Sequence, residues 1–234
     1  LVCQCVAGAA LGVGWSGAVG PAAVRADLTQ GTNRIPAAVS GVHTRPIPSF
    51  RQDIEPVLTR LGCNMGACHG KQAGQNGFRL SLRGYAPEMD HPWLTSDVLG
   101  RRINPAFPEE SLLVQKPLGK VPHEGGVRFD ENSRYYKTLI AWIAARSPGP
   151  VPPENEPSVE RIEILPGDRI AQPGQKQQLI VRAHWSDGRV KDVTWLTQVF
   201  STNEPTASVT PARLVLVRRS CVTRLRDHFQ GVGS

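Results

Sequence analysis

The sequence predicts a multi-domain chain in which a mostly α domain precedes an incomplete all-β sandwich. Apolar residues recur at helical spacing near residues 54–61 and 135–143, whereas residues 158–217 alternate between apolar and polar as strands do. Between the two patterns, residues 147–153 form a proline-rich segment that cannot continue a helix. The 23 Gly and 20 Pro among 234 residues favour short elements joined by many turns.

Residues 1–26 have the character of a secretory signal peptide. The first 24 residues carry no charged side chain, are rich in Ala, Gly and Val, and lead into the small-x-small pattern Val24-Arg25-Ala26. The alternative is a membrane anchor, for which the segment is long enough but only mildly apolar. We therefore expect export to the periplasm or the cell surface. Residues 27–47 lack periodicity and are expected to form a linker.

The net charge of +7 is unevenly distributed along the chain. Five arginines against Asp227 in residues 210–234 contribute +4 of it, so more than half of the excess lies near the end of the sequence. The rest of the chain has no stripe of Lys and Arg interleaved with aromatic residues. Nucleic acid is therefore not an expected partner.

Two helices are expected to enclose a compact domain at residues 48–147. The first has Pro56 in its opening turn and an apolar face made by Ile54, Val57, Leu58 and Leu61. The second is expected to begin at Ser133 as N-cap, with a face made by Tyr135, Leu139, Trp142 and Ile143. The loops between them are long for so small a domain. A large prosthetic group would supply the apolar surface that these loops lack.

The motif Gly62-Cys63-Asn64-Met65-Gly66-Ala67-Cys68-His69-Gly70 carries the chemistry of this domain. Two thiols followed at once by an imidazole are what covalent haem attachment uses: each thiol adds to a haem vinyl group, and the histidine binds the iron. The usual spacing has two residues between the cysteines, and here there are four. Two alternatives remain open at this point. One is a Cys63–Cys68 disulfide, and the other is a zinc site, which lacks a fourth ligand.

Segment 50–146 resembles the planctomycete cytochrome c-like domain of large exported proteins. The matching runs are FRQDIEPVL at 50–58, GCNMGACHG at 62–70, NGFRLSLRGY at 76–85, PEESLLVQKPLGKVPHEGG at 108–126 and AWI at 141–143. The resemblance implies a c-type cytochrome fold holding one covalent haem c between a helix before the motif and a closing helix. Cys63 and Cys68 would then form thioethers, and His69 would be the proximal iron ligand.

The resemblance also implies a distal ligand from a loop shortly before the last helix. His123, in Val121-Pro122-His123-Glu124-Gly125-Gly126, occupies that position, and Met89 is the second candidate. Ligation by two histidines would give a lower potential than ligation by His and Met. Arg101 and Arg102 are candidates to neutralise haem propionates, or else form a solvated basic pair.

Residues 158–217 are expected to form the all-β domain, joined to the first by a proline-rich linker at 148–157. Leu179, Val181, Ala183 and Trp185 alternate with polar neighbours, Ser186-Asp187-Gly188 predicts a turn, and Asp192-Val193-Thr194-Trp195 resumes a strand. The segment resembles the bacterial Ig-like domain of group 2 up to Val209. Such modules serve as spacers or adhesive surfaces. Beyond it the pattern is lost, and residues 218–234 are expected to be a divergent basic tail in which Cys221 is unpaired.

Together these features predict an exported haem protein that transfers single electrons and is a carrier, not an enzyme. Its electron partner would be an unidentified redox protein. The Ig-like part would make any contact with the cell envelope or with polysaccharide. The alternative is a haem-free cell-surface protein with a Cys63–Cys68 disulfide and an adhesive Ig-like part.

Overall fold

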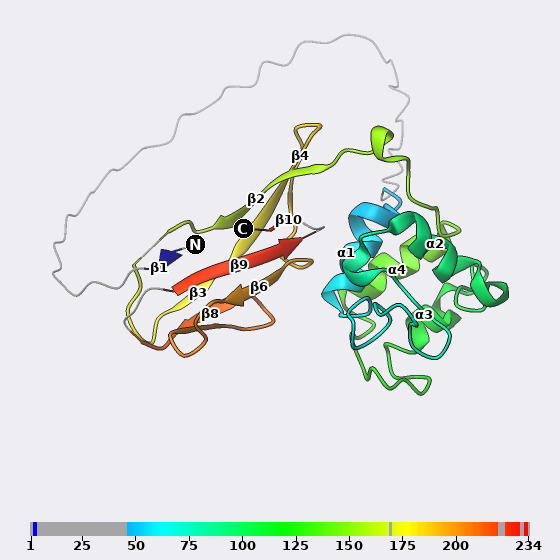
Figure 1. Ribbon diagram of the computed structural model, residues 1–234, viewed down its shortest axis with the longest axis horizontal. Helices are drawn as coiled ribbons and strands as arrows, with labels where there is room; N and C mark the ends of the chain where they lie inside the picture. Colours follow the sequence, from blue (N-terminus) through cyan, green and yellow to red (C-terminus); the bar gives the residue numbers. More distant parts are fainter. Residues whose placement is uncertain (1, 4–45, 169, 220–222, 230–231, 234) are drawn as a thin grey trace, which may run out of the picture. The chain divides into compact units, whose positions relative to one another are not determined.

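The computed structural model describes residues 2–3, 46–168, 170–219, 223–229 and 232–233. Apart from Val2 and Cys3, the predicted signal peptide lies outside these residues, as do Cys221 and all but residues 46 and 47 of the predicted linker. Among the helices that are described, none combines the length and the apolar character needed to cross a membrane. Figure 1 shows the helices in residues 50–144 and most of the strands after residue 158.

The helical elements are short. The α-helices of the described residues are α1 (Glu55–Arg60), α2 (Pro87–Thr95), α3 (Leu112–Gln115) and α4 (Arg134–Ala144). A five-residue π-helical turn, Phe50–Ile54, leads directly into α1. Single 3₁₀ turns occupy Leu82–Gly84, Asp97–Gly100, Pro108–Glu110 and Pro153–Asn155.

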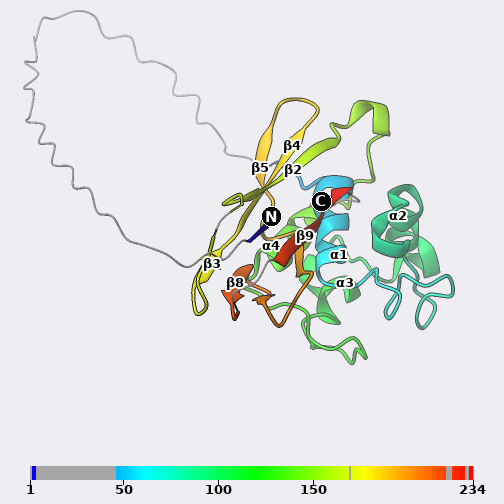
Figure 2. The ribbon, with the colours of Figure 1, turned by 60° about the vertical axis from the view of Figure 1, so that its left-hand side comes forward.

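Both predicted helices are confirmed, with their expected start signals. Pro56 lies in the first turn of α1, as expected. Ser133 caps α4, because its hydroxyl oxygen accepts a hydrogen bond from the Tyr136 N–H at 3.2 Å. The π-helical turn that leads into α1 packs against α4, with the ring centres of Phe50 and Trp142 5.6 Å apart. Figures 1 and 2 show α1 and α4 within the helical part of the chain.

The expected fold class, a mostly α domain followed by an incomplete all-β sandwich, is wrong. In the described part of the chain the α-helices are few and short, and the strands form several small antiparallel groups, so the fold is mixed and not mostly α. The reason lies in residues 61–133, where the Gly- and Pro-rich sequence forms turns and loops whose backbone groups bond to one another. Only two short helices, α2 and α3, interrupt these loops.

The strands pair in small antiparallel groups. They are β1 (Val2–Cys3), β2 (Val159–Leu165), β3 (Lys176–Gln178), β4 (Ile180–Trp185), β5 (Val190–Asp192), β6 (Gln198–Ser201), β7 (Ala207–Val209), β8 (Leu214–Val217), β9 (Thr223–Phe229) and β10 (Val232–Gly233). One group has the order β2-β4-β5 and another the order β3-β8-β7, while β9 pairs with β1, β6 and β10.

The predicted alternation holds in the central strand. Val181, Ala183 and Trp185 of β4 are buried, and the neighbouring Ile180 and Arg182 are exposed. The strand expected at Asp192–Trp195 instead ends at Asp192, and a turn follows. In residues 218–234, where a divergent tail was expected, β9 pairs with β6.

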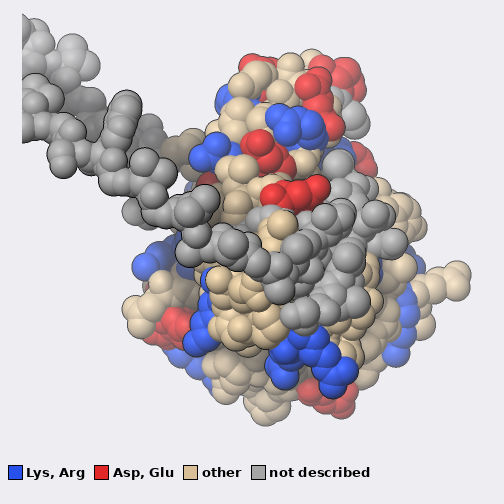
Figure 3. Space-filling view, turned by 90° about the vertical axis from the view of Figure 1, so that its left-hand side faces the viewer, with Lys and Arg blue, Asp and Glu red and all other residues tan. Residues whose placement is uncertain are grey.

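The surface is mixed in charge. On the face shown in Figure 3, Lys and Arg side chains are interspersed with Asp and Glu over the described residues and do not form one basic stripe. This distribution matches the low and unevenly distributed net charge.

The Ser133 cap gives a first prediction. Ser133→Ala removes the acceptor for the Tyr136 N–H, and we expect the free energy of unfolding to fall by about 1 kcal/mol. The neighbouring Asn132→Ala, at an exposed position, is the control and is expected to change it by less than about 0.5 kcal/mol. Urea unfolding followed by circular dichroism measures both. Equal losses in the two variants would contradict the assigned cap.

Candidate functional site

The cysteine-histidine motif folds back onto the end of α1. The Cys63 N–H donates to the Leu58 carbonyl at 2.9 Å, and the His69 N–H donates to the Cys63 carbonyl at 3.0 Å. Gly62 has a φ of 78°, a left-handed conformation that ends a helix at low cost only in glycine. The four residues between the cysteines are thus taken up in a closed turn. His69 therefore begins directly beside Cys63.

Gly70 completes this turn by close backbone approach. A Cβ atom at this position would lie 2.0 Å from the Asn64 carbonyl oxygen, a distance that no side chain tolerates. The Gly70 N–H donates to the Met65 carbonyl at 3.0 Å. Only glycine can therefore follow His69 in this loop.

The His69 imidazole is held by one nitrogen. Its Nδ1 lies 3.0 Å from the Phe78 carbonyl oxygen, and the two rings pack at 4.5 Å. Because a carbonyl only accepts, Nδ1 carries the proton and Nε2 keeps its lone pair. Burial lowers the pKa of His69, which favours the same neutral form. This is the state in which an imidazole binds a metal ion.

His123 is held in the same way from the opposite side. Its Nδ1 lies 3.1 Å from the Gly126 carbonyl oxygen, and the Gly126 N–H returns a bond to the His123 carbonyl. The Lys116 ammonium donates to the Pro122 carbonyl and fixes the start of the loop. Gly125 leaves room for the ring, since a Cβ there would lie 2.7 Å from His123 Cε1.

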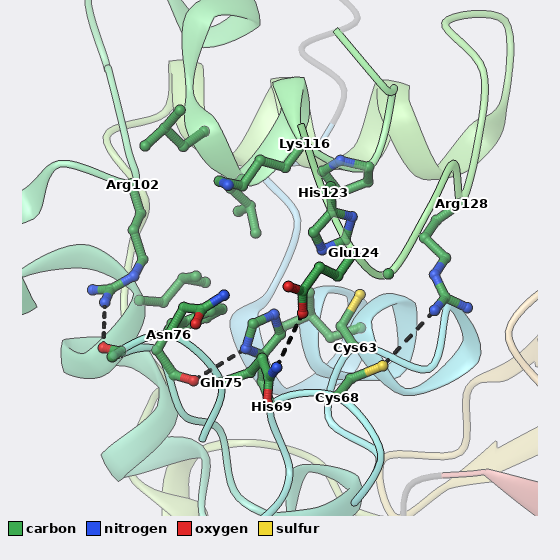
Figure 4. Close-up of a pocket in the computed structure, with 18 of the residues that line it drawn as sticks. Cys63, Cys68, His69, Gln75, Asn76, Arg102, Lys116, His123, Glu124 and Arg128 are labelled. Atoms are coloured by element: carbon green, nitrogen blue, oxygen red, sulfur yellow. Dashed lines mark hydrogen bonds between the residues drawn. The ribbon is translucent and has the colours of Figure 1, made fainter. Parts of the chain in front are cut away.

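The two imidazoles face each other across a cavity (Figure 4). Their ring centres are 6.5 Å apart, and their planes differ by 9°. Each ring keeps its Nε2 unprotonated at this cavity, so the two histidines are the residues that could hold one metal ion there.

The cavity has a volume of about 1020 Å³. That is at the upper end of the range of about 300–1,000 Å³ for sites of small molecules and cofactors. Cys63, Cys68, His69 and His123 all line it, so the structure brings together all four of the residues that the sequence singled out as its first choices. Much of the remaining wall is apolar and comes from Leu58, Phe78, Leu94, Leu112 and Leu113.

Cationic side chains also border the cavity. Arg101, Lys116 and Arg128 line it, and Gln75 donates to the Glu124 carboxylate at 3.2 Å. Both arginines that we expected to neutralise propionates line the cavity. The guanidinium of the buried Arg102 also donates to the carbonyls of Trp93, Asp97 and Gly77, and so joins the end of α2 and the 3₁₀ turn after it to the loop at Gly77.

Both cysteines are free thiols in this structure and are not joined to each other. Burial raises the pKa of the Cys63 thiol to about 12, against the opposing influence of Arg128. The Arg128 guanidinium lies 3.8 Å from Cys68 Sγ (Figure 4). Within the described part of the chain, no three His, Cys, Asp or Glu side chains converge as a metal cluster, so the zinc alternative gains no support.

Met89, the second candidate for distal ligand, lies apart from this site. It is half-exposed on α2 and does not line the cavity. Its neighbour His91 turns into the core, where Nε2 meets the Ser147 carbonyl at 2.8 Å and the ring packs edge-on against Phe50.

Several site residues were not identified from the sequence. They are Gly126, whose carbonyl accepts from His123, Gly125, Lys116, which donates to the Pro122 carbonyl, and Glu124, which accepts from Gln75. The adjacent pair Gly125-Gly126, two residues after His123, was the available signal, because paired glycines allow a backbone carbonyl to turn back onto a nearby side chain.

Comparison with models of known protein families finds no match for this chain. Comparison with curated protein sequences finds none either. The resemblances inferred from the motifs therefore stay predictions, and the functional argument depends on the geometry of the cavity.

The raised pKa of Cys63 predicts its reactivity. In the Cys68→Ser chain, alkylation of Cys63 by iodoacetamide is expected to accelerate about tenfold per pH unit from pH 7 to 10, because the thiolate is the nucleophile. Mass spectrometry of the peptide containing Cys63 gives the rate. The same chain in guanidinium is the control, with a plateau near the ordinary thiol pKa of about 8.5. A plateau near that value in the folded chain would disprove the burial of this thiol.

Proposed function

We propose that this chain binds one haem covalently and passes single electrons, as an exported c-type cytochrome-like carrier. The observation that carries the proposal is the pair His69 and His123, whose parallel rings lie 6.5 Å apart across a cavity that both cysteines line. When bound there, haem would supply one-electron chemistry at its iron. The side chains of this chain would anchor, ligate and surround that group.

Cys63 and Cys68 would anchor the group. Each S–H would add across one vinyl group, with sulfur joining one carbon and hydrogen the other, so that no atom leaves and no oxidant is consumed. Both thiols are free and line the same cavity, as such an addition requires. The closed turn between them compensates for the two extra residues of the motif, since it places His69 directly beside Cys63.

His69 and His123 would be the two axial ligands. Each offers Nε2 because its Nδ1–H is held by a carbonyl, of Phe78 and Gly126 respectively. The same bonds fix the ring planes. If both histidines held the iron, they would leave no place on it for a substrate, so we infer a carrier and not an enzyme.

The walls of the cavity would set the environment. The leucine side chains and Phe78 would give the bound group apolar contacts. Arg101, Lys116 and Arg128 would pair with the negatively charged propionates at the border. Arg102 is not assigned this role, because backbone carbonyls take its donors. The electron partner would be another redox protein outside the cytoplasm.

The first test is a visible spectrum of the chain exported from cells competent in cytochrome c maturation, oxidised and then reduced with dithionite. We expect a sharp Soret band, split α and β bands on reduction, and a haem-positive band on a denaturing gel. Cys63→Ser with Cys68→Ser is expected to abolish the gel band. His123→Ala is expected to abolish the split bands but keep the haem, and Met89→Ala, away from the cavity, is the control. A folded, colourless wild-type chain would disprove the proposal and favour the haem-free alternative.

A second test uses Gly125. Gly125→Ala would place a methyl group 2.7 Å from His123 Cε1 and is expected to displace the ring. In the haem-loaded chain we expect a shift from a low-spin to a high-spin spectrum while the covalent haem is retained. The matched control is Gly167→Ala, where the added methyl group has nothing within 4 Å. An unchanged low-spin spectrum in Gly125→Ala would count against His123 as the ligand.

A further inference from the structure

A second site lies behind the apolar wall of the cavity and involves two buried carboxyl groups. Glu55, the first residue of α1, is only 4% exposed, and Asp90 of α2 is fully buried. Carboxylates are almost never buried in this way unless they are paired with a cation or hydrogen-bonded. Glu55 and Asp90 therefore each need a cation, a hydrogen-bond donor or a proton.

Asp90 is well supplied with hydrogen-bond donors. Its Oδ1 accepts from the Ser81 N–H at 2.5 Å, and its Oδ2 accepts from the Ser81 hydroxyl. Donors of this kind favour the ionised form of a carboxyl group. Burial raises the pKa of Asp90, but these donors oppose that rise, so Asp90 is the member of the pair that more readily keeps its negative charge.

Glu55 is in the opposite situation. Neither of its carboxyl oxygens accepts a hydrogen bond of good geometry from the described residues. The side chain faces Asp90, and the Asn64 amide beside it donates to Thr59 Oγ1. Burial, followed by the charge of Asp90, raises the pKa of Glu55 well above its ordinary value. A protonated Glu55 would turn this repulsion into a hydrogen bond from its O–H to Asp90.

The charged groups around the pair do not replace that proton. The charge of Arg51, in the turn before α1, lowers the pKa of Glu55 but is the smallest of its causes. The Arg51 guanidinium also forms an ion pair with the exposed Glu88. Glu88 adds further negative charge beside Asp90. Gly84 closes over the pair, since a Cβ there would lie 2.5 Å from Glu55 Oε2. The tight enclosure favours a proton over a metal ion.

We propose that Glu55 and Asp90 form a buried proton-binding site that holds one shared proton at neutral pH and joins α1 to α2 behind the cavity. Glu55 lies one turn before Leu58 and Asp90 one turn before Leu94, and both leucines line the cavity. Loss of the proton would leave two adjacent buried charges. The wall of the cavity would loosen as a result. This inference concerns the folded chain itself and does not depend on haem.

The sign of the pH dependence follows from the raised pKa of Glu55. The folded chain holds the proton more tightly than the unfolded chain does, so the stability it contributes is complete below the ordinary pKa of glutamate. It is lost as the pH rises through the raised pKa of the folded state. For one proton, the unfolding equilibrium constant would increase by up to about tenfold per pH unit in that window.

The experiment is urea unfolding of the full chain from pH 4 to pH 9, followed by tryptophan fluorescence. We expect the wild-type unfolding constant to rise with pH. In Glu55→Gln, whose amide can still donate to Asp90, this rise is expected to be lost, so that the variant becomes the more stable chain at the alkaline end. Glu88→Gln is the matched control on the same helix, and because Glu88 is exposed, the alkaline rise should persist. An equal rise in wild type and Glu55→Gln would overturn the proposal.

Two measurements on the wild-type chain keep the test decisive if Glu55→Gln fails to fold. The infrared band of a protonated carboxyl should be present at neutral pH, shift in D₂O and disappear at alkaline pH. Addition of calcium or of a chelator should leave the unfolding constant unchanged. Absence of the band would overturn the proposal and show that both carboxyl groups are ionised. Stabilisation by calcium would overturn it in favour of a cation site. Neither readout requires haem, so failure here and failure of the proposed function are distinguishable.

Discussion

The backbone hydrogen bonds that fasten the cysteine motif to the end of α1 determine the rest of the site. The bonds from Cys63 to Leu58 and from His69 to Cys63 turn the chain back on itself, so that one thiol and one imidazole start from adjacent points. From there, the single bond to the Phe78 carbonyl sets the direction of the His69 ring. The positions of the thiol and the imidazole depend less on the number of residues between Cys63 and Cys68 than on the closed turn. The turn takes up the two residues by which this motif exceeds the usual spacing.

The sequence predicts best where one local signal is sufficient. The helix at Glu55–Arg60 and the helix at Arg134–Ala144 each combine an apolar stripe with a start signal, Pro56 and Ser133, and both form as expected. His123 was chosen as a ligand because of its position in the segment that resembles a cytochrome c-like domain. In the structure its side chain lines the cavity. The prediction of a mostly α domain was wrong because these two helices do not determine the structure of the long segment between them. That segment is held by hydrogen bonds between loops, and such bonds leave no periodic pattern in the sequence.

Other features depend on pairs of residues far apart in the chain. Glu55 and Asp90 are separated by 35 positions, and in the sequence each looks like a solvated helix residue. Arg102 looked like a propionate partner because a basic pair suggests an anion, but its donors meet the carbonyls of Trp93, Asp97 and Gly77. In both cases the chemistry of a side chain follows from burial, and burial is set by contacts that no short window of sequence contains.

The cavity of about 1020 Å³ also has a consequence for the fate of newly made chains. A domain this small that surrounds so large a space lacks part of its own core, so an occupant stabilises it by simple mass action, and a covalent occupant does so permanently. Under the proposed function, chains without haem would open more often, and proteases that act on open molecules would degrade them first. The incomplete core would then make the survival of each chain depend on haem attachment.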